Sequence, residues 1–113
     1  MIVRNLSDRE VMETTYRAHG GAVAQMILDR RVLREIGFLA IATLPAGNRI
    51  ESHVDPMEEI YIVVSGTGVM GVGEEEREVG PGDAVWIPAG DPHELLATGE
   101  EPCVVLVVAS DRF

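Results

Sequence analysis

Hydrophobic positions along most of this chain come in short runs that are separated by turn-forming residues. The runs lie at 22–28, 38–44, 59–64, 69–72, 84–87, 93–97 and 103–109, with Gly, Pro, Asn or acidic residues between them. A short run rich in Val and Ile is too brief for a core helix and is typical of a β-strand. Many such strands in sequence predict an all-β sandwich or barrel.

Two stretches carry a more specific prediction. Every position from Cys103 to Ala109 is apolar. A strand with one face in water alternates apolar and polar residues, so this run predicts a strand that is buried on both faces, between layers. At 73–76 a glycine is followed by three glutamates, which predicts a solvent-exposed hairpin tip.

The first 21 residues differ from the rest, because their polarity is mixed and they end in His19-Gly20-Gly21. We expect a short irregular N-terminal segment at 1–21, followed by one β-domain at 22–113. Ser7 and Glu10 have the spacing of a capping box, so one helical turn is expected after Ser7. A length of 113 residues suits a single domain.

The net charge of the chain makes some classes of binding partner unfavourable. Nineteen acidic and nine basic side chains give a formal charge of −10, which repels nucleic acid and anionic membranes. No run reaches the length of a membrane span or of a signal peptide, so a cytoplasmic protein is expected. Cys103 is the single cysteine, so an internal disulfide and a thiolate metal cluster are excluded.

Histidines and carboxylates provide the candidate chemistry. Residues two apart on a strand share a face, so His53 and Asp55 are expected to point together, and Glu59 has the same parity. Far along the chain, His93 opens another predicted strand after a Pro-rich turn. Nitrogen and oxygen donors of this kind suit a divalent Fe, Mn, Zn, Ni or Co ion.

The spacing of the flanking glycines and prolines resembles the two motifs of the cupin family. The first motif has Gly, five residues, His-x-His, three or four residues, Glu, six residues and Gly, and is matched by Gly47, His53, Asp55, Glu59 and Gly66. The second has Gly, five residues, Pro-x-Gly, two residues and His, and is matched by Gly82, Pro88, Gly90 and His93. Together they run from Gly47 to about Ala97.

This resemblance implies a small single-domain cupin, a double-stranded β-helix or jelly-roll-like barrel with one divalent transition metal inside. The implied metal ligands are His53, Asp55, Glu59 and His93. Two positions depart from the family pattern: Asp55 replaces the second histidine of the first motif, and Ala97 replaces an asparagine. The asparagine is not a usual ligand, so Ala97 bears on substrate contact more than on metal binding.

Asp55 leaves three interpretations open. A ligating Asp55 gives a harder donor set that favours Mn(II) or Fe(II). If Asp55 is too short to reach the ion, a three-residue shell of His53, Glu59 and His93 remains. If the barrel has lost its metal, the two histidines hydrogen-bond the carboxylates as a buried polar network.

For function, the resemblance implies a metalloenzyme that acts on a small polar organic molecule, as a dioxygenase or as an isomerase or lyase. Glu59 or Asp55 would then serve as the catalytic base. The alternative is a non-catalytic cupin module that binds or senses a small ligand. Small cupins usually dimerise, so a homodimer is expected, with the N-terminal segment pairing with a neighbour's sheet.

A few further residues are candidates for the cavity wall. Tyr61 and Met26 line a substrate pocket or simply pack in the core. Trp86 either lines the pocket or covers a subunit contact. His19 lies outside both motifs and either folds over the barrel mouth, as an extra ligand or acid/base group, or belongs to a mobile loop.

Overall fold

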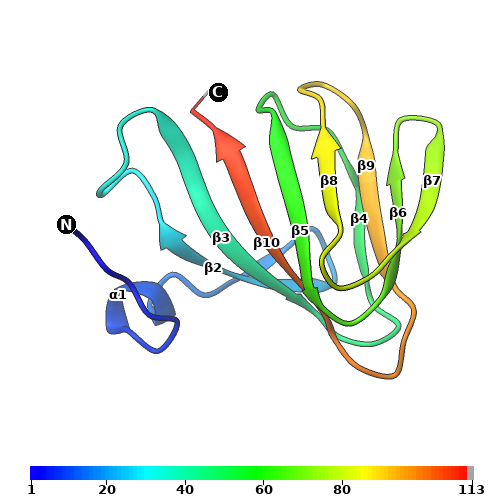
Figure 1. Ribbon diagram of the computed structural model, residues 1–113, viewed down its shortest axis with the longest axis horizontal. Helices are drawn as coiled ribbons and strands as arrows, with labels where there is room; N and C mark the ends of the chain where they lie inside the picture. The colour runs from blue at the N-terminus through cyan, green and yellow to red at the C-terminus, as the bar shows by residue number, and fades with distance from the viewer. Residues whose placement is uncertain (112–113) are drawn as a thin grey trace.

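The computed structural model describes residues 1–111 as a β-protein with one short helical turn (Figure 1). The all-β prediction is confirmed. The elements are α1 (Arg9–Met12), β1 (Tyr16–Ala18), β2 (Ala22–Leu28), β3 (Ile36–Leu44), β4 (Arg49–His53), β5 (Glu59–Ser65), β6 (Gly68–Val72), β7 (Glu75–Val79), β8 (Ala84–Ile87), β9 (His93–Ala97) and β10 (Cys103–Ser110).

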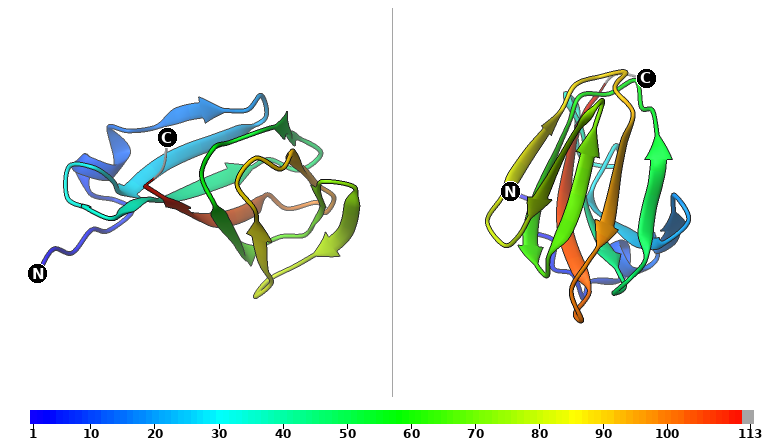
Figure 2. Two further views of the ribbon diagram at one scale, coloured as in Figure 1. Left: turned by 90° about the horizontal axis from the view of Figure 1, so that it is seen from above. Right: turned by 90° about the vertical axis from the view of Figure 1, so that its right-hand side faces the viewer.

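The strands form two antiparallel sheets that curve toward each other around a common interior (Figure 2). Six strands make the larger sheet, in the order β1-β2-β3-β10-β5-β8. Four make the smaller one, in the order β4-β9-β6-β7. The first motif therefore runs from the smaller sheet (β4) into the larger one (β5), and the second ends on β9, beside β4.

The core lies between the inner faces of the two sheets. Along β10 every second residue is buried, and two of these residues are opposite alanines of β3: Val105 pairs with Ala42, and Val107 pairs with Ala40. Leu95 of β9 and Ile87 of β8 fill the interior from the other strands. Aliphatic and alanine side chains thus supply most of the core, as the scarcity of aromatic residues predicts.

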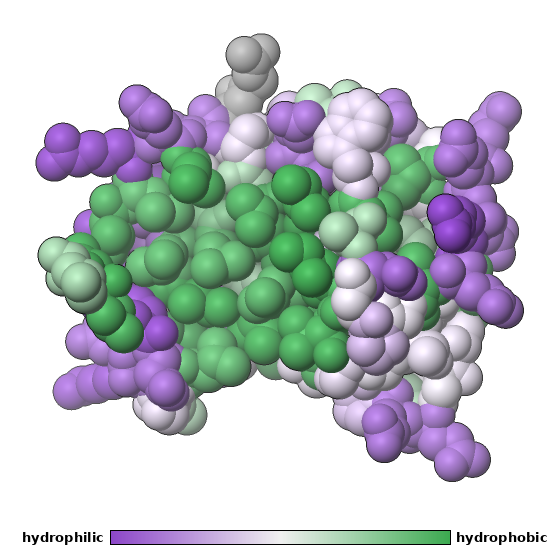
Figure 3. All heavy atoms as spheres, in the orientation of Figure 1, coloured by the Kyte–Doolittle hydropathy of each residue, from purple (hydrophilic) through white to green (hydrophobic). Residues whose placement is uncertain are grey.

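The prediction that 103–109 is buried on both faces is wrong for the single chain. Val104, Leu106 and Val108 are half-buried and point away from the interior. With residues of the neighbouring strands they form a continuous hydrophobic surface (Figure 3). We call it the outer apolar face, and it comprises Val23, Leu39, Ile41, Ile60, Ile62, Val64, Trp86, Val104, Leu106 and Val108.

The N-terminal segment is more regular than expected. A helical turn is present, but Asp8 takes the N-cap position and forms no side-chain cap, whereas Ser7 hydrogen-bonds the Asn5 side chain. Strand β1 pairs with β2 in its own chain, with Tyr16 opposite Ala24 and Ala18 opposite Ala22. The sheet therefore begins inside the segment that was expected to be irregular.

The glutamate run is also only partly a turn. Gly73 and Glu74 form the turn, while Glu75 and Glu76 belong to β7 and are exposed there. This strand lies at an edge of the smaller sheet, and its charged sequence gives no apolar alternation to detect. Among residues 1–111, no helix is long and apolar enough to cross a membrane.

Candidate metal centre

The two motif histidines meet across the β4–β9 strand pair. His53 ends β4, His93 begins β9, and the two residues are direct partners in the antiparallel register. Their ring centroids lie 4.2 Å apart, with the planes tilted by 60°. Two histidines that are forty residues apart in the sequence thus lie at one place.

Backbone carbonyls orient both rings. Nδ1 of His53 lies 2.7 Å from the carbonyl oxygen of Glu51, and Nδ1 of His93 lies 3.0 Å from that of Asp91. A carbonyl accepts only, so each Nδ1 carries the proton and donates it. Each neutral imidazole then has a lone pair on Nε2, and a hydrogen bond from the other ring nitrogen to a carbonyl is usual for a metal-binding histidine.

Two carboxylates complete the cluster. Oδ2 of Asp55 lies 3.2 Å from Nε2 of His53 and 3.7 Å from Nε2 of His93. Asp55 follows the end of β4, so the loop brings it back to the histidines even though the regular strand has ended. Oε1 of Glu59, at the start of β5, lies 3.5 Å from Nε2 of His93.

Glu59 and His93 hold the most informative pair of atoms. The residues are 3% and 1% exposed, yet neither Oε1 of Glu59 nor Nε2 of His93 has a hydrogen-bond partner within the described chain. Buried polar atoms are nearly always satisfied, because leaving them without a partner costs free energy. A fully hydrogen-bonded polar network, the metal-free interpretation, is therefore not what these two atoms form.

The donors fit a divalent cation. Ligand atoms of Asp55, Glu59 and His93 all lie within 4.8 Å of one another, and those of His19, His53 and Asp55 form a second such group. Asp55 belongs to both groups, so it joins the two imidazoles of the motifs. A cation at this place would satisfy both orphaned atoms, and its charge would be balanced by two carboxylates.

Burial and mutual proximity shift the protonation of this cluster. Burial raises the pKa of Glu59, and the neighbouring Asp55 charge adds to the rise. Burial by itself lowers the pKa of His93, but the Glu59 carboxylate and the Asp91 carbonyl outweigh that effect, so the pKa is raised. Burial and the nearby Glu59 charge raise the pKa of Tyr61 as well, which keeps its hydroxyl protonated.

A cavity of about 180 Å³ adjoins the cluster. Its apolar wall is made of small side chains from β2 and β3, together with Met26, Phe38 and Met57. Tyr61 and Met26 line it, at the places where sequence analysis expected pocket residues. Trp86 does not line it: this side chain is 62% exposed on the outer apolar face and borders a separate hollow beside β6 and β7.

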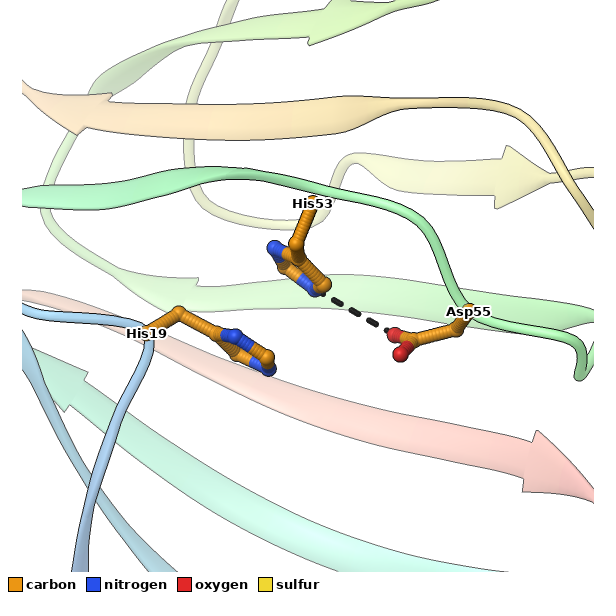
Figure 4. Close-up of side chains that lie close together, drawn as sticks. All are labelled: His19, His53 and Asp55. Carbon is orange, nitrogen blue, oxygen red and sulfur yellow. Dashed lines mark ion pairs between the residues drawn. The ribbon is translucent and has the colours of Figure 1, made fainter.

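Two residues at the cavity were missed or left open by sequence analysis. Tyr16 lines the cavity from β1, and burial together with the Glu59 and Asp55 charges raises its pKa. His19 also lines it, with its ring stacked on that of His53 (Figure 4). No motif marks Tyr16, but His19 has one signal: it is one of just three histidines in the sequence.

Comparison with known proteins agrees with this geometry. The family model described as "Cupin domain" matches residues 40–109. The chain belongs to the cupin family. An uncharacterized protein of Streptomyces coelicolor, SCO3923, is 31% identical over 96 residues, which cover 85% of this chain and 87% of that protein.

Two solved structures are similar to this chain in fold. A predicted oxalate decarboxylase of Thermotoga maritima has a TM-score of 0.83 at 23% identity, over 96% of this cupin and 98% of that chain. The dimethylsulfoniopropionate lyase DddQ of Ruegeria pomeroyi is 36% identical over 69 residues, which cover 60% of this cupin and 34% of the lyase. Its crystal structure has a TM-score of 0.73 at 26% identity, over 82% of this cupin and 48% of that chain.

Proposed function

We propose that this cupin is an enzyme that binds one divalent transition metal and acts on a small polar organic molecule in the adjoining cavity. The proposed protein ligands are His53, Asp55, Glu59 and His93. The observation that carries the proposal is the buried pair of Glu59 Oε1 and His93 Nε2, 3.5 Å apart and both without a hydrogen bond. The ion is Fe, Mn, Zn, Ni or Co, since the donors are nitrogen and oxygen.

The side chains suit proton transfer. When bound, the metal would act as a Lewis acid that polarises a carbonyl or carboxylate oxygen of the substrate. Glu59 lines the cavity, and when its carboxylate leaves the ion it would be placed to accept a proton from carbon. Asp55, in contact with both imidazoles, is the second candidate base.

Among the reactions that cupins perform, this arrangement favours a lyase or isomerase over a dioxygenase. Two carboxylates lie at the wall of the cavity, where a base is needed for proton abstraction. The resemblance to a dimethylsulfoniopropionate lyase supports the same class, although it covers 69 residues. The substrate would be small, since the cavity holds only about 180 Å³.

Metal analysis tests the first half of the proposal. The full chain is stripped with chelator, reloaded separately with Fe(II), Mn(II), Zn(II), Ni(II) and Co(II), desalted and measured by elemental analysis. We expect one ion per chain for wild type and for Glu94→Gln, an exposed carboxylate on the same strand as His93. His93→Ala and Glu59→Gln should lose it. Absence of every one of the five metals from wild type would refute the proposal.

Proton exchange tests the second half. Small carboxylic acids are incubated with metal-loaded protein in D2O, and deuterium incorporation or elimination is followed by NMR. We expect exchange with wild type and Glu94→Gln, and none with Glu59→Gln, which lacks both the proposed base and a proposed metal ligand. A molecule that stabilises the protein against heat but is recovered without exchange or conversion would instead identify a binding module.

We also propose that the protein is a homodimer joined through the outer apolar face. Five strands at about 4.8 Å spacing, each contributing about 20 Å of length, give a surface of about 500 Å² in projection. That is smaller than the accessible area of about 800 Å² that each partner buries in a standard interface. It lies in the range of about 300–600 Å² for the largest apolar patch of a monomer, and such patches are often functional. A second copy offers the same apolar surface, whereas the hydrophilic rim in Figure 3 would disfavour contact elsewhere.

A further inference from the structure

His19 lies in the turn between β1 and β2, far from both motifs in the sequence but next to them in space. Its ring is parallel to that of His53, with centroids 3.4 Å apart and planes inclined by only 8°. Figure 4 shows the two rings side by side, with Asp55 beyond His53. Because His53 in turn contacts His93, every histidine of the 113-residue sequence belongs to this one cluster.

The backbone around His19 is built to hold it there. His19 has φ of +46°, the one positive φ among non-glycine residues in the part of the chain that the structure describes. Left-handed backbone is uncommon for residues with a Cβ, and observed cases concentrate at functional sites. The His19 carbonyl accepts hydrogen bonds from the amides of Glu51 and Gly21, so the turn is fastened to β4 two residues before His53.

The two glycines after His19 make this attachment possible. A Cβ on Gly21 would lie 2.3 Å from the backbone carbonyl oxygen of Arg49, and a Cβ on Gly20 would meet the Glu51 side chain. Gly20 also forms an isolated antiparallel bridge with Ile50. Close approach of backbone to backbone is a role for glycine, and it brings the N-terminal turn onto the strand that carries His53.

We propose that His19 is a metal ligand that supplies the imidazole missing from the first cupin motif, where Asp55 replaces histidine. This inference rests on the proposed metal centre. Ring nitrogens of His19 and His53 and a carboxylate oxygen of Asp55 lie within 4.8 Å of one another. The resulting set of three imidazoles and carboxylate oxygen comes from three separate parts of the chain.

For both His19 and His53 to bind one ion, one of the two stacked rings must change its orientation. Two parallel rings cannot both aim a lone pair at one ion, so one ring must turn. His53 is fixed through its Nδ1 to the Glu51 carbonyl, whereas His19 is exposed and rotates about its side-chain bonds at small cost. His19 is therefore the ring that moves when the ion binds.

A third imidazole changes which metals the site prefers. Imidazole suits Ni(II), Co(II) and Zn(II), while a set dominated by carboxylates suits Mn(II). Loss of His19 should consequently weaken binding of Ni(II) and Co(II) much more than binding of Mn(II). A purely structural role for His19, as a cover over His53, would weaken all three to a similar extent.

The test compares metal affinities of the full chain. Stripped wild type, His19→Ala, His19→Gln and the control Arg17→Ala, an exposed residue of β1, are titrated with Ni(II), Co(II) and Mn(II) by calorimetry. We expect the two His19 variants to bind Ni(II) and Co(II) at least about tenfold more weakly, a typical loss for one supporting group, and Mn(II) within about threefold of wild type. The Co(II) absorption spectrum should change in these variants and stay unchanged in Arg17→Ala.

Two results would overturn the proposal, and each is distinct from failure of the metal centre itself. One is wild-type Ni(II) affinity and an unchanged Co(II) spectrum in His19→Ala, while His93→Ala loses the metal. The other is an equal fall for all three metals. If wild type binds none of the three, the proposed role of His19 is refuted, and the metal centre is refuted with it when Fe(II) and Zn(II) are not bound either. Circular dichroism of each variant confirms that the fold is retained.

Discussion

The two faces of the larger sheet are made by alternate residues of the same strands, yet they differ in almost every property. Toward the interior, β2 and β3 present Ala22, Ala24, Ala40 and Ala42, all buried. Toward the outside, the same sheet presents Ile, Leu, Val and Trp side chains that are half-buried or exposed. In this sheet, four alanines of β2 and β3 thus face inward, while many large apolar side chains face outward.

This reversal has a physical explanation. Small inner residues leave the space of the cavity beside Glu59 and His93, which larger side chains would fill. The outer apolar face does not line this cavity, and its large branched residues are typical of a surface that another layer covers. We infer that the inner face is shaped by a ligand and the outer face by a partner chain.

The largest expected effect comes from charging the outer face. Ile60 and Val64 are 40% and 50% exposed in the single chain, so Ile60→Asp/Val64→Asp should leave the fold intact. Buried and unpaired in a dimer, the two carboxylates should weaken association by more than about 100-fold, since an uncompensated buried charge costs about 3 kcal/mol or more. Light scattering over a dilution series measures this change.

The control for that experiment is Ala46→Asp, which adds one negative charge at an exposed turn outside the outer apolar face. Metal content should be the same in wild type, in the control and in the charged variant. A wild-type mass of about 12 kDa at all concentrations would contradict the dimer, as would a charged variant that remains dimeric.

Filling the inner face should have the next largest effect. Ala42→Leu adds bulk to the wall of the cavity, where about 180 Å³ is available, so the fold can accept it. Proton exchange or turnover should fall by about 10- to 100-fold, because a substrate displaced by about 1 Å reacts far more slowly. Thr43→Leu, the next residue on the same strand and on the opposite face, is the matched control.

Metal content and oligomeric state should be unchanged in both of these variants. If Ala42→Leu keeps full activity, the substrate does not use the cavity beside the metal centre. Equal losses in Ala42→Leu and Thr43→Leu would show that the two faces are not separate in function.

Acidification should weaken metal binding at the inner face and leave association through the outer apolar face unchanged. The pKa of His93 is raised above its ordinary 6.5, so the metal-free site keeps a proton that the metal must displace. Affinity should therefore fall as pH decreases through the range just above 6.5, by about tenfold per unit for each displaced proton. The raised pKa of Glu59 adds to the fall at lower pH.

Calorimetric titration with Zn(II) or Ni(II) between pH 8 and about pH 6 measures this effect. The outer apolar face contains no titratable side chain, so the dimer mass should stay constant over the same range. Metal affinity that is independent of pH would mean that neither Glu59 nor His93 gives up a proton on binding.

The sequence predicted some features of both faces of the larger sheet. The cluster of His53, Glu59 and His93 was predictable, because two long motifs fix the spacing of residues on β4, β5 and β9. The unbroken apolar run of β10 correctly indicated that both faces are hydrophobic. It could not indicate that residues 1–111 leave one of these faces open, because the hydrophobicity of a residue does not reveal which segment or molecule covers it.

Strand β7 and the position of His19 could not be predicted from the sequence. Strand β7 is charged and lies at an edge, so nothing in its pattern of polarity marks it. The position of His19 depends on a left-handed turn and on a backbone bridge from Gly20 to Ile50, which are long-range contacts. The contact between His53 and Asp55 was predicted correctly but for the wrong reason. The prediction placed both residues on one face of a strand, whereas β4 ends at His53 and Asp55 lies in the loop that follows.

Removing the Tyr61 hydroxyl, which lines the cavity on the inner face, should have the smallest effect of these changes. The Tyr61 ring is 4% exposed, meets the His93 ring edge-on at 5.9 Å, and lines the cavity. Because its pKa is raised, the hydroxyl stays protonated and can donate a hydrogen bond to a bound molecule, but it cannot act as a base. Tyr61→Phe removes this donor while keeping the ring that packs against His93.

We expect Tyr61→Phe to raise KM by about three- to tenfold, the value of one hydrogen bond of about 1 kcal/mol, with metal affinity within about twofold of wild type. Steady-state kinetics and metal titration of the same preparation separate the two quantities. A loss of metal as large as that of His93→Ala would instead place the Tyr61 oxygen among the ligands. An unchanged KM would mean that the substrate occupies the part of the cavity nearer Tyr16 and His19, on the side of β1.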